Sequence, residues 1–138
     1  DRQQIAREWL GEELPPSVGR TYLSVKLTAD PKSDGITWPA NEQTDGTNQV
    51  HLAVSPEKAL GGPLAHEVAH TVLSTRYPKN LAPWINEGIA CQYDGSDRKA
   101  IRKKILAWYA RTGNWPSIQK TLDAKRIPGQ RPGGLRRL

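Results

Sequence analysis

The sequence of 138 residues contains no phenylalanine, no methionine and a single cysteine, Cys91. One cysteine excludes an internal disulfide, and it indicates no particular cellular compartment. Because phenylalanine is absent, the 5 tryptophans must supply much of the aromatic packing. No apolar run comes near the ~18 residues that a membrane-spanning helix needs, so we predict no membrane span. The length indicates one domain.

The chain begins at Asp1 and has no methionine from which its own translation could start. We therefore expect residues upstream of Asp1 to be missing. Removal of a secretory leader would suit a secreted or periplasmic protein, but no leader pattern with a charged start and an apolar middle is visible. The sequence leaves the compartment open.

The net charge of +6 is unevenly distributed along the chain. Residues 1–97 contain 8 Lys+Arg and 13 Asp+Glu, whereas residues 98–138 contain 12 Lys+Arg and 1 Asp. A basic segment of this kind can attract nucleic acid or an anionic surface. Aromatic and basic side chains do not alternate regularly there, so we interpret it as a solvated helix with a tail, and we do not expect nucleic acid to be the main partner.

The strongest functional signal is Leu-Ala-His-Glu-Val-Ala-His at residues 64–70. On a helix, His66 and His70 lie about 40° apart, so both imidazoles can bind one ion. Glu67 lies at about 100° on the same polar arc. Two histidines at this spacing, with a glutamate after the first, are typical of a catalytic zinc helix in which the glutamate is the general base. The opposite arc is apolar and consists of Leu64, Ala65, Val68, Ala69, Val72 and Leu73.

A catalytic zinc site has three protein ligands and an open position for water, so a third ligand is needed. The chain has 3 histidines, and none follows His70. The metzincin pattern requires Gly and His where this chain has Leu73 and Arg76, so that class is excluded. A carboxylate remains. Glu87 lies beyond a break at residues 77–80, in a predicted second helix, and a short antiparallel helix pair would bring it back opposite the histidines.

His-Glu-x-x-His followed by Trp-Ile-Asn-Glu-Gly-Ile-Ala resembles the gluzincin group of zinc metallopeptidases, whose third ligand is a Glu in a Trp-x-Asn-Glu-Gly-x-Ala context. The resemblance covers residues 64–93. It implies that His66, His70 and Glu87 hold one Zn²⁺ per chain, with Glu67 as the general base. It also implies a zincin-like fold and hydrolysis of peptide bonds in a peptide or protein substrate.

This chain departs from the thermolysin-like gluzincins at one position. They have an Asp four residues after the ligand Glu, where it orients a ligand histidine, and here that position is Cys91. The group that orients His66 or His70 is therefore not identified, and Asn86 is a candidate. The donor that stabilises the oxyanion, a Tyr or His in many gluzincins, is also open. The tyrosines to consider are Tyr77, Tyr93 and Tyr109.

No Gly-x-Met-Glu-Asn segment precedes the zinc helix, and related aminopeptidases capture a free amino terminus with that segment. The resemblance therefore favours an endopeptidase. Two alternatives stay open. A chain that holds zinc but has lost its oxyanion donor would be an inactive pseudopeptidase that binds proteins. A basic nucleic-acid or anionic-surface binder would instead associate in a strongly salt-dependent manner.

The N-terminal part of the chain predicts one helix and a small sheet. Helical spacing over residues 5–10 predicts a short helix capped by Gly11. Alternation predicts half-buried strands at residues 21–29 and 49–54, with a short strand at 36–38. The expected inward side chains are Leu23, Val25, Leu27, Val50, Leu52 and Val54.

The strand at residues 49–54 directly precedes the zinc helix. In gluzincins the strand in that place often forms a sheet edge along which an extended peptide lies, so the resemblance implies that 49–54 aligns the substrate. His51 faces away from the packing side of this strand. We interpret it as a surface histidine because three metal ligands are already assigned.

Two further helices are predicted in the C-terminal third, one ending near Gly113 and one over residues 115–125. Residues 94–97 predict a turn and a helix cap, and residues 128–138 predict a mobile basic tail beyond a single domain spanning 1–127. The expected architecture is α+β, with a small mixed sheet, the zinc helix packed on it and a helical C-terminal part. The first of the two helices is expected to pack through Ile101, Ile105, Leu106, Trp108 and Tyr109.

Overall fold

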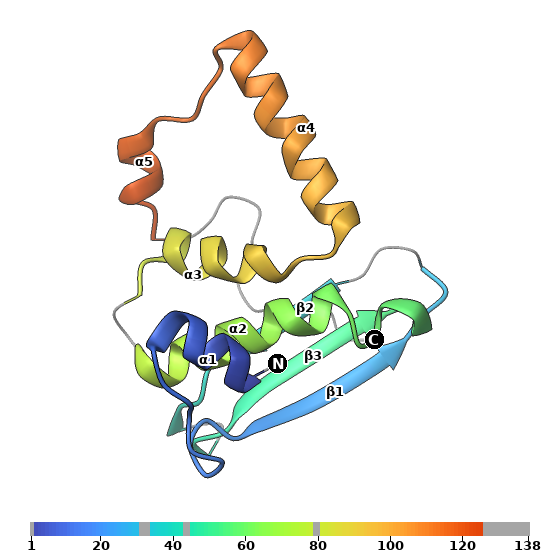
Figure 1. The fold of residues 1–138 in the computed structure, drawn as a ribbon, viewed down its shortest axis with the longest axis vertical. Helices are drawn as coiled ribbons and strands as arrows, with labels where there is room; N and C mark the ends of the chain where they lie inside the picture. The colour runs from blue at the N-terminus through green and yellow to red at the C-terminus, as the bar shows by residue number, and fades with distance from the viewer. Residues whose placement is uncertain (1, 31–33, 43–44, 79–80, 126–138) are drawn as a thin grey trace.

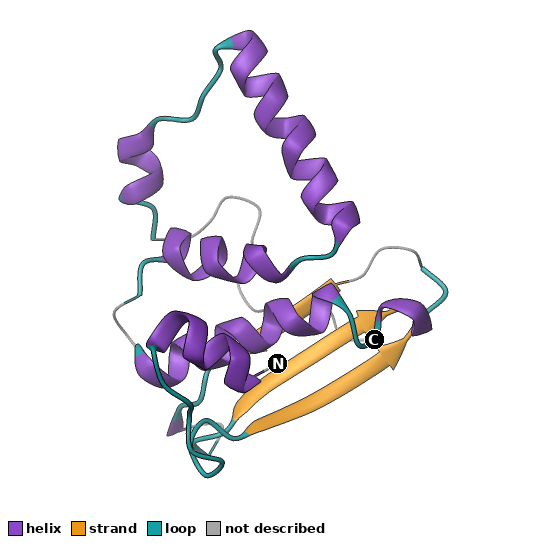
Figure 2. Cartoon of the chain, in the orientation of Figure 1, coloured by secondary structure: helices purple, strands orange, loops and turns teal. Residues whose placement is uncertain are grey.

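The computed structural model describes residues 2–30, 34–42, 45–78 and 81–125. These residues form helices and a small mixed sheet, so the predicted α+β class is confirmed. Figures 1 and 2 show helices lying against the sheet and a helical arm, residues 96–122, that extends away from it. In the described ranges, no helix combines the length and the apolar character needed to cross a membrane. The tail predicted at 128–138 lies outside the described residues.

The sheet contains β1 (Thr21–Leu27), β2 (Asp34–Trp38) and β3 (Asn48–Val54), in the order β1-β3-β2. β3 is parallel to β1 and antiparallel to β2. The prediction that the strand at 49–54 forms a sheet edge is therefore wrong, because hydrogen-bonded neighbours occupy both of its sides. β2 is the edge strand on one side and β1 on the other.

β3 has the predicted alternation, with Val50, Leu52 and Val54 buried. These side chains face the layer of α2 (Gly62–Arg76), which packs on β3 and β2. His51 lies on the opposite face of the sheet, where its ring centroid is 4.9 Å from that of Trp38. This placement confirms that His51 points away from the helix with the other two histidines.

β1 also alternates, but it is not half-buried as predicted. In the parallel register its apolar residues lie beside the buried β3 residues and on the same face. Leu23, Val25 and Leu27 are nevertheless 44%, 43% and 60% exposed. The reason is that α2 packs over β3 and β2, so that among the described residues the β1 side of this face is largely uncovered.

Helix α1 (Arg2–Leu10) lies against α2 and ends, as predicted, at Gly11, which has a φ of 78°. Its buried residues Ile5 and Ala6 join a core cluster that also contains residues of α2 and α3. The indole N–H of Trp9 donates a 2.8 Å hydrogen bond to the hydroxyl of Tyr93. This contact ties the N-terminal helix to a segment more than eighty residues later.

Helix α3 (Pro83–Ala90) begins with proline and runs back beside α2 in the opposite direction (Figure 1). A short 3₁₀ helix, η3 (Cys91–Tyr93), continues from it and also contacts α2. A second 3₁₀ turn, η2 (Pro56–Lys58), connects β3 to α2. The predicted antiparallel helix pair is thus confirmed, and it brings the segment around Glu87 next to α2.

Helix α4 (Ser96–Thr112) ends at Gly113, as predicted, with a φ of 69°. Helix α5 (Ile118–Leu122) is shorter than the predicted 115–125. It starts later because Ser117 is its N-cap and accepts a hydrogen bond from the backbone of Lys120.

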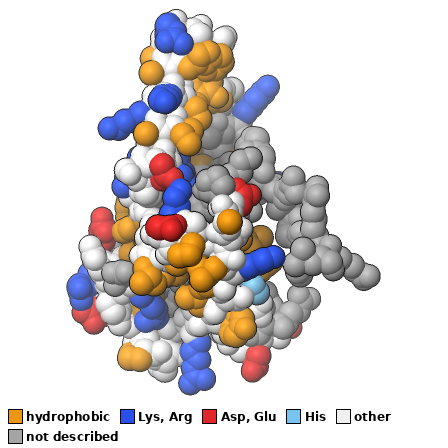
Figure 3. All heavy atoms as spheres, turned by 90° about the vertical axis from the view of Figure 1, so that its right-hand side faces the viewer, with side chains coloured by type: hydrophobic (Ala, Val, Ile, Leu, Met, Phe, Trp, Pro, Cys, Tyr) orange, Lys and Arg blue, Asp and Glu red, His pale blue; other side chains and the backbone are white. Residues whose placement is uncertain are grey.

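The prediction that α4 packs through its apolar residues is wrong. No residue of α4 is buried, and the helix extends away from the sheet (Figure 1). Tyr109 stacks on Trp115 with ring centroids 5.4 Å apart, so these two aromatic residues pack on each other. In Figure 3 hydrophobic and basic side chains lie side by side on this upper part of the molecule. The exposed fractions are Ile101 57%, Ile105 47%, Leu106 54% and Trp108 43%.

Matched leucine substitutions test this division between core and arm. Leu73→Ala removes a side chain of α2 that is 1% exposed, and it should lower the free energy of unfolding by about 2–5 kcal/mol. Leu106→Ala changes a 54% exposed side chain, and it should alter that free energy by less than about 0.5 kcal/mol. Urea denaturation of both variants measures the difference. Equal losses would show that α4 packs on the body of the protein.

Candidate metal centre

Helix α2 carries three of the four predicted site residues. His66 and Glu67 are each 6% exposed, and His70 is partly buried. The rings of His66 and His70 are inclined at 78° with centroids 4.9 Å apart. Their Nε2 atoms lie 3.2 Å from each other. The four-residue spacing therefore directs both imidazoles toward the same point, as predicted.

Glu87 of α3 reaches this point from the other side. Its Oε2 lies 3.8 Å from Nε2 of His66, and its Oε1 lies 3.5 Å from Nε2 of His70. Two ligand atoms bound at 2.0–2.1 Å on a tetrahedral zinc ion would be roughly 3.3–3.4 Å apart. The three distances of 3.2, 3.5 and 3.8 Å are close to that value. His66, His70 and Glu87 therefore have the separation that zinc ligands require.

The outer nitrogen of each imidazole faces an acceptor oxygen. Nδ1 of His70 lies 3.0 Å from Oδ1 of Asn86, and Nδ1 of His66 lies 3.1 Å from Oδ1 of Asp94. The hydrogen bond between His70 and Asn86, and the negative charge of Asp94 beside His66, both favour the neutral tautomer that carries its proton on Nδ1 and its lone pair on Nε2. Two lone pairs then point at one another beside the carboxylate of Glu87. Such an electron-rich group of atoms is stabilised by a cation.

Burial lowers the pKa of His66, and the neighbouring His70 lowers it further. The carboxylates of Asp94, Glu67 and Glu87 act in the opposite direction and raise this pKa, but the lowering prevails. The balance favours a neutral imidazole at His66. The neutral form is the one that binds a metal ion.

Residues 94–97 were predicted to contain a turn and a helix cap, and the N-cap of α4 lies in this segment, at Gly95. The prediction did not include the contact that the side chain of Asp94 makes with His66. The Asp94 side chain is fully buried against His66, and Arg102 and Arg98 of α4 contact its two oxygens, the latter at 3.6 Å. A carboxylate next to His66 is thus provided three residues after Cys91. An acidic residue shortly after Glu87 was the available sequence signal.

A glycine permits this close approach of the segment that follows η3. A Cβ atom at Gly62, in the first turn of α2, would lie 2.2 Å from the backbone nitrogen of Gly95. A larger residue at 62 would push Asp94 and Gly95 away from the helix. The position of Asp94 behind His66 therefore depends on Gly62.

A second group of possible ligands shares one residue with the first. Ligand atoms of His66, Cys91 and Asp94 also lie within 4.8 Å of one another. Burial raises the pKa of the Cys91 thiol, whereas zinc binds the deprotonated thiolate. Asp94 is also engaged by two arginines. The group of His66, His70 and Glu87 is therefore the better metal site.

Glu67 is absent from both ligand groups in the described part of the chain, as expected for a base rather than a ligand. Its Oε2 accepts a 2.6 Å hydrogen bond from the hydroxyl of Thr37 in β2. Gly35, two residues earlier on the same face of β2, lies against the other carboxylate oxygen. Neither Gly35 nor Thr37 belongs to a motif that predicts a role at the site. The signal was their alternation in a strand next to the buried face of β3.

The predicted tyrosines have different surroundings. The hydroxyl of Tyr93 donates a 2.6 Å hydrogen bond to Oε2 of Glu8. Burial together with this hydrogen bond raises the pKa of Tyr93 to about 12. Tyr109 stacks on Trp115 in the arm. Tyr77, just after α2, is 43% exposed. The hydroxyl of Tyr93 is thus directed to α1, and the oxyanion donor stays unassigned.

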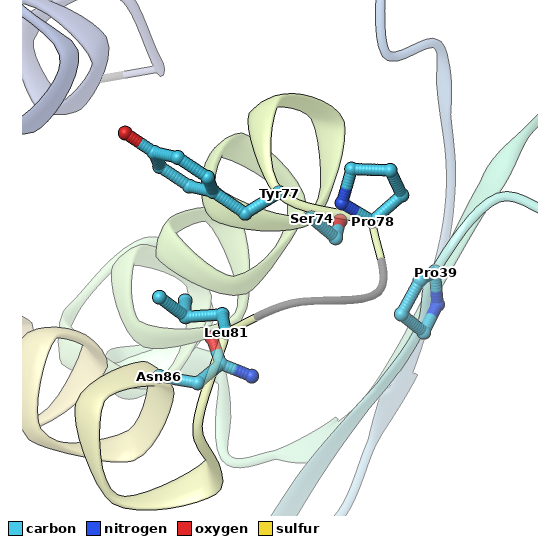
Figure 4. Close-up of a pocket in the computed structure, with 6 residues that line it drawn as sticks. All are labelled: Pro39, Ser74, Tyr77, Pro78, Leu81 and Asn86. Atoms are coloured by element: carbon cyan, nitrogen blue, oxygen red, sulfur yellow. The ribbon is translucent and has the colours of Figure 1, made fainter.

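A small cavity of about 150 Å³ adjoins the centre at the end of α2. It begins where β2 ends, at Pro39, and includes Asn86, whose side chain contacts His70. In Figure 4 the ring of Tyr77 extends away from Pro39, with its hydroxyl directed outward. The cavity lining consists of Pro39, Ser74, Tyr77, Pro78, Leu81 and Asn86.

Two glycine substitutions test the contact between β2 and Glu67. A Cβ at Gly35 would lie 2.6 Å from Oε1 of Glu67 and 2.9 Å from Cδ2 of Leu52. Gly35→Ala should therefore lower the free energy of unfolding by about 1–3 kcal/mol through overpacking. Gly88→Ala, in α3, meets no atom within 4 Å and should stabilise the protein by up to about 1 kcal/mol through helix propensity. Thermal denaturation of both variants checks the opposite signs; a Gly35→Ala variant as stable as the parent would contradict the packing.

Removing the charge of Asp94 tests its contact with His66. Asp94→Asn should weaken zinc binding by about 10–100-fold, because the carboxylate beside Nδ1 of His66 is replaced by a neutral amide. Competition with a chromophoric zinc chelator measures the affinity. Asp97→Asn is the control, because this exposed residue pairs with Lys58 and should leave the affinity unchanged. The same affinity in both variants would remove Asp94 from the site.

Comparisons with models of protein families, with curated proteins and with solved structures give no match for this chain. The chemistry of the site is therefore inferred from its own geometry and from the motif that residues 64–93 contain.

Proposed function

We propose that the protein is a zinc-dependent endopeptidase of the gluzincin type with a zincin-like fold. The observation that carries this proposal is the convergence of His66, His70 and Glu87 at separations of 3.2–3.8 Å. Both Nε2 lone pairs and the carboxylate of Glu87 point toward one position. A divalent cation bound there would compensate the negative charge of these groups. His66, His70 and Glu87 would be the zinc ligands.

Zinc in this position would supply a Lewis acid that activates water and polarises a carbonyl group. Glu67 would be the residue that moves protons. Its carboxylate is buried, and the hydroxyl of Thr37 holds one oxygen at 2.6 Å. Glu67 would accept a proton from the attacking water and later deliver it to the leaving amine. Thr37 would fix the direction in which the carboxylate points.

The strand proposed to align the substrate is β2. It is an edge of the sheet, and its residue Thr37 touches Glu67. An extended peptide can add to such an edge through backbone hydrogen bonds, which suits a substrate bound in the middle of its chain. Pro39 and the small cavity next to Asn86 follow directly after β2. A small side chain of the substrate would fit there.

One observation favours the inactive alternative, a pseudopeptidase that binds proteins. The hydroxyl of Tyr93 donates a hydrogen bond to Glu8, Tyr109 stacks on Trp115, and the hydroxyl of Tyr77 is directed outward (Figure 4), so none of the three candidates is assigned as oxyanion donor. Nucleic-acid binding is disfavoured because Arg98 and Arg102 of the basic segment are turned toward the buried Asp94.

Glu67→Gln separates the active enzyme from the pseudopeptidase. Zinc content should stay near one per chain, while cleavage of casein and of a peptide library should fall by about 10²–10⁴-fold because the general base is lost. The parent protein, assayed at equal zinc content, is the reference. A parent protein that binds zinc without cleaving any peptide would establish the pseudopeptidase, and a parent that binds no zinc would exclude both.

A further inference from the structure

Within the described ranges, β1 is an edge strand without the usual protection against pairing with another chain. It runs for seven residues, Thr21–Leu27, without a proline and with a single charged residue, Lys26. Edge strands of natural proteins are normally blunted by charges, prolines or bulges, because their open backbone groups pair readily. Its apolar residues Leu23, Val25 and Leu27 are also 43–60% exposed. Both its edge and its inner face are suited to a partner.

The parallel pairing with β3 determines which backbone groups of β1 are open. The carbonyl of Arg20 accepts from the backbone nitrogen of Asn48, and the backbone nitrogen of Thr28 donates to the carbonyl of Val54. In a parallel ladder every second residue directs both its groups to the same neighbour, so the even-numbered residues of β1 bond to β3. The odd-numbered residues point outward. They are Thr21, Leu23, Val25 and Leu27.

We propose that two copies of this chain pair through β1 in antiparallel fashion, with a two-fold axis at Ser24. The two sheets would join into one of six strands. Leu23 would lie opposite the partner's Val25, and Thr21 opposite the partner's Leu27. These are the residues with outward backbone groups, so each opposed pair can exchange both of its hydrogen bonds.

The sequence of β1 is self-complementary in this register, as a two-fold contact requires. Thr21, Leu23, Val25 and Leu27 share the inner face, so apolar side chains meet apolar side chains across most of the junction. On the outer face the positive charge of Lys26 lies opposite the ring of the partner's Tyr22, where a cation–π contact is favourable. The two lysines are not opposed, so no like charges meet directly. Ser24 faces the partner's Ser24, and both are small.

This pairing is independent of the proposed peptidase activity. β1 and β2 are opposite edges of the sheet, with β3 between them. The dimer would therefore leave β2 and its contact with Glu67 free to bind an extended substrate. Junctions of two short strands lie at the small end of specific interfaces, so we expect a dissociation constant in the micromolar range.

Disulfide trapping tests the register directly, in a Cys91→Ala background so that each chain has one cysteine. Opposed residues at Ser24 form a non-hydrogen-bonded pair with Cα atoms about 4.5 Å apart, which a disulfide can span. Ser24→Cys should therefore give covalent dimers under mild oxidation. Tyr22→Cys and Lys26→Cys should each give few alone, because each faces the other position. Mixing these two variants should give heterodimers.

Analytical ultracentrifugation of the chain with β1 unchanged supplies a measurement without cysteine chemistry. It should show a monomer–dimer equilibrium, and Val25→Lys should raise the dissociation constant by at least about tenfold, because it opposes a charge to an apolar residue. Equal cross-linking of the three single variants would overturn the proposed register. A monomer at high micromolar concentration would overturn the dimer, and would indicate that another part of the chain or a different protein covers β1.

Discussion

The constraint on which this site depends is electrostatic. Nε2 of His66 and Nε2 of His70 lie 3.2 Å apart, each with an acceptor behind the ring, and the carboxylate of Glu87 lies within 3.8 Å of both. These groups do not attract one another, and without a cation they would favour an arrangement in which they lie further apart. A divalent cation at their centre reverses the sign of the interaction. Because these three side chains come from α2 and α3, a metal ion bound between them would also stabilise the packing of these two helices.

The side chains that surround His66, Glu67, His70 and Glu87 come from three further parts of the chain. β2 holds Glu67 through Thr37, and it can approach because Gly35 has no side chain. The segment after η3 places Asp94 behind His66, and α4 provides the arginines that compensate this buried carboxylate. The loss of one partner from a buried ion pair leaves the other charge uncompensated. Helix α4 thus contributes to the centre through charge, while its apolar residues are exposed.

Residue spacing and alternation were sufficient to predict features that depend on a single helix or strand. The spacing of His66 and His70 on a helix fixed their common direction, and alternation located β3 with its buried face. These patterns were insufficient to predict features that depend on which other element packs against the residue. The same alternation predicted a half-buried β1, although no helix of the described residues covers that strand's inner face. Asp94 has the sequence of a helix cap, and only the turn of the chain after Cys91 places it against His66. Gly35 and Thr37 acquire a role through the pairing of β2 with β3.

X-ray absorption spectroscopy at the zinc edge can decide whether His66, His70 and Glu87 bind the metal, because it reports the ligand atoms themselves. After addition of one equivalent of zinc, we expect a shell of nitrogen and oxygen atoms at about 2.0–2.1 Å, from two imidazoles, one carboxylate and solvent. A sulfur atom at about 2.3 Å would instead assign the metal to the group that contains Cys91. That result, or a spectrum of fully hydrated zinc, would contradict the site described for His66, His70 and Glu87.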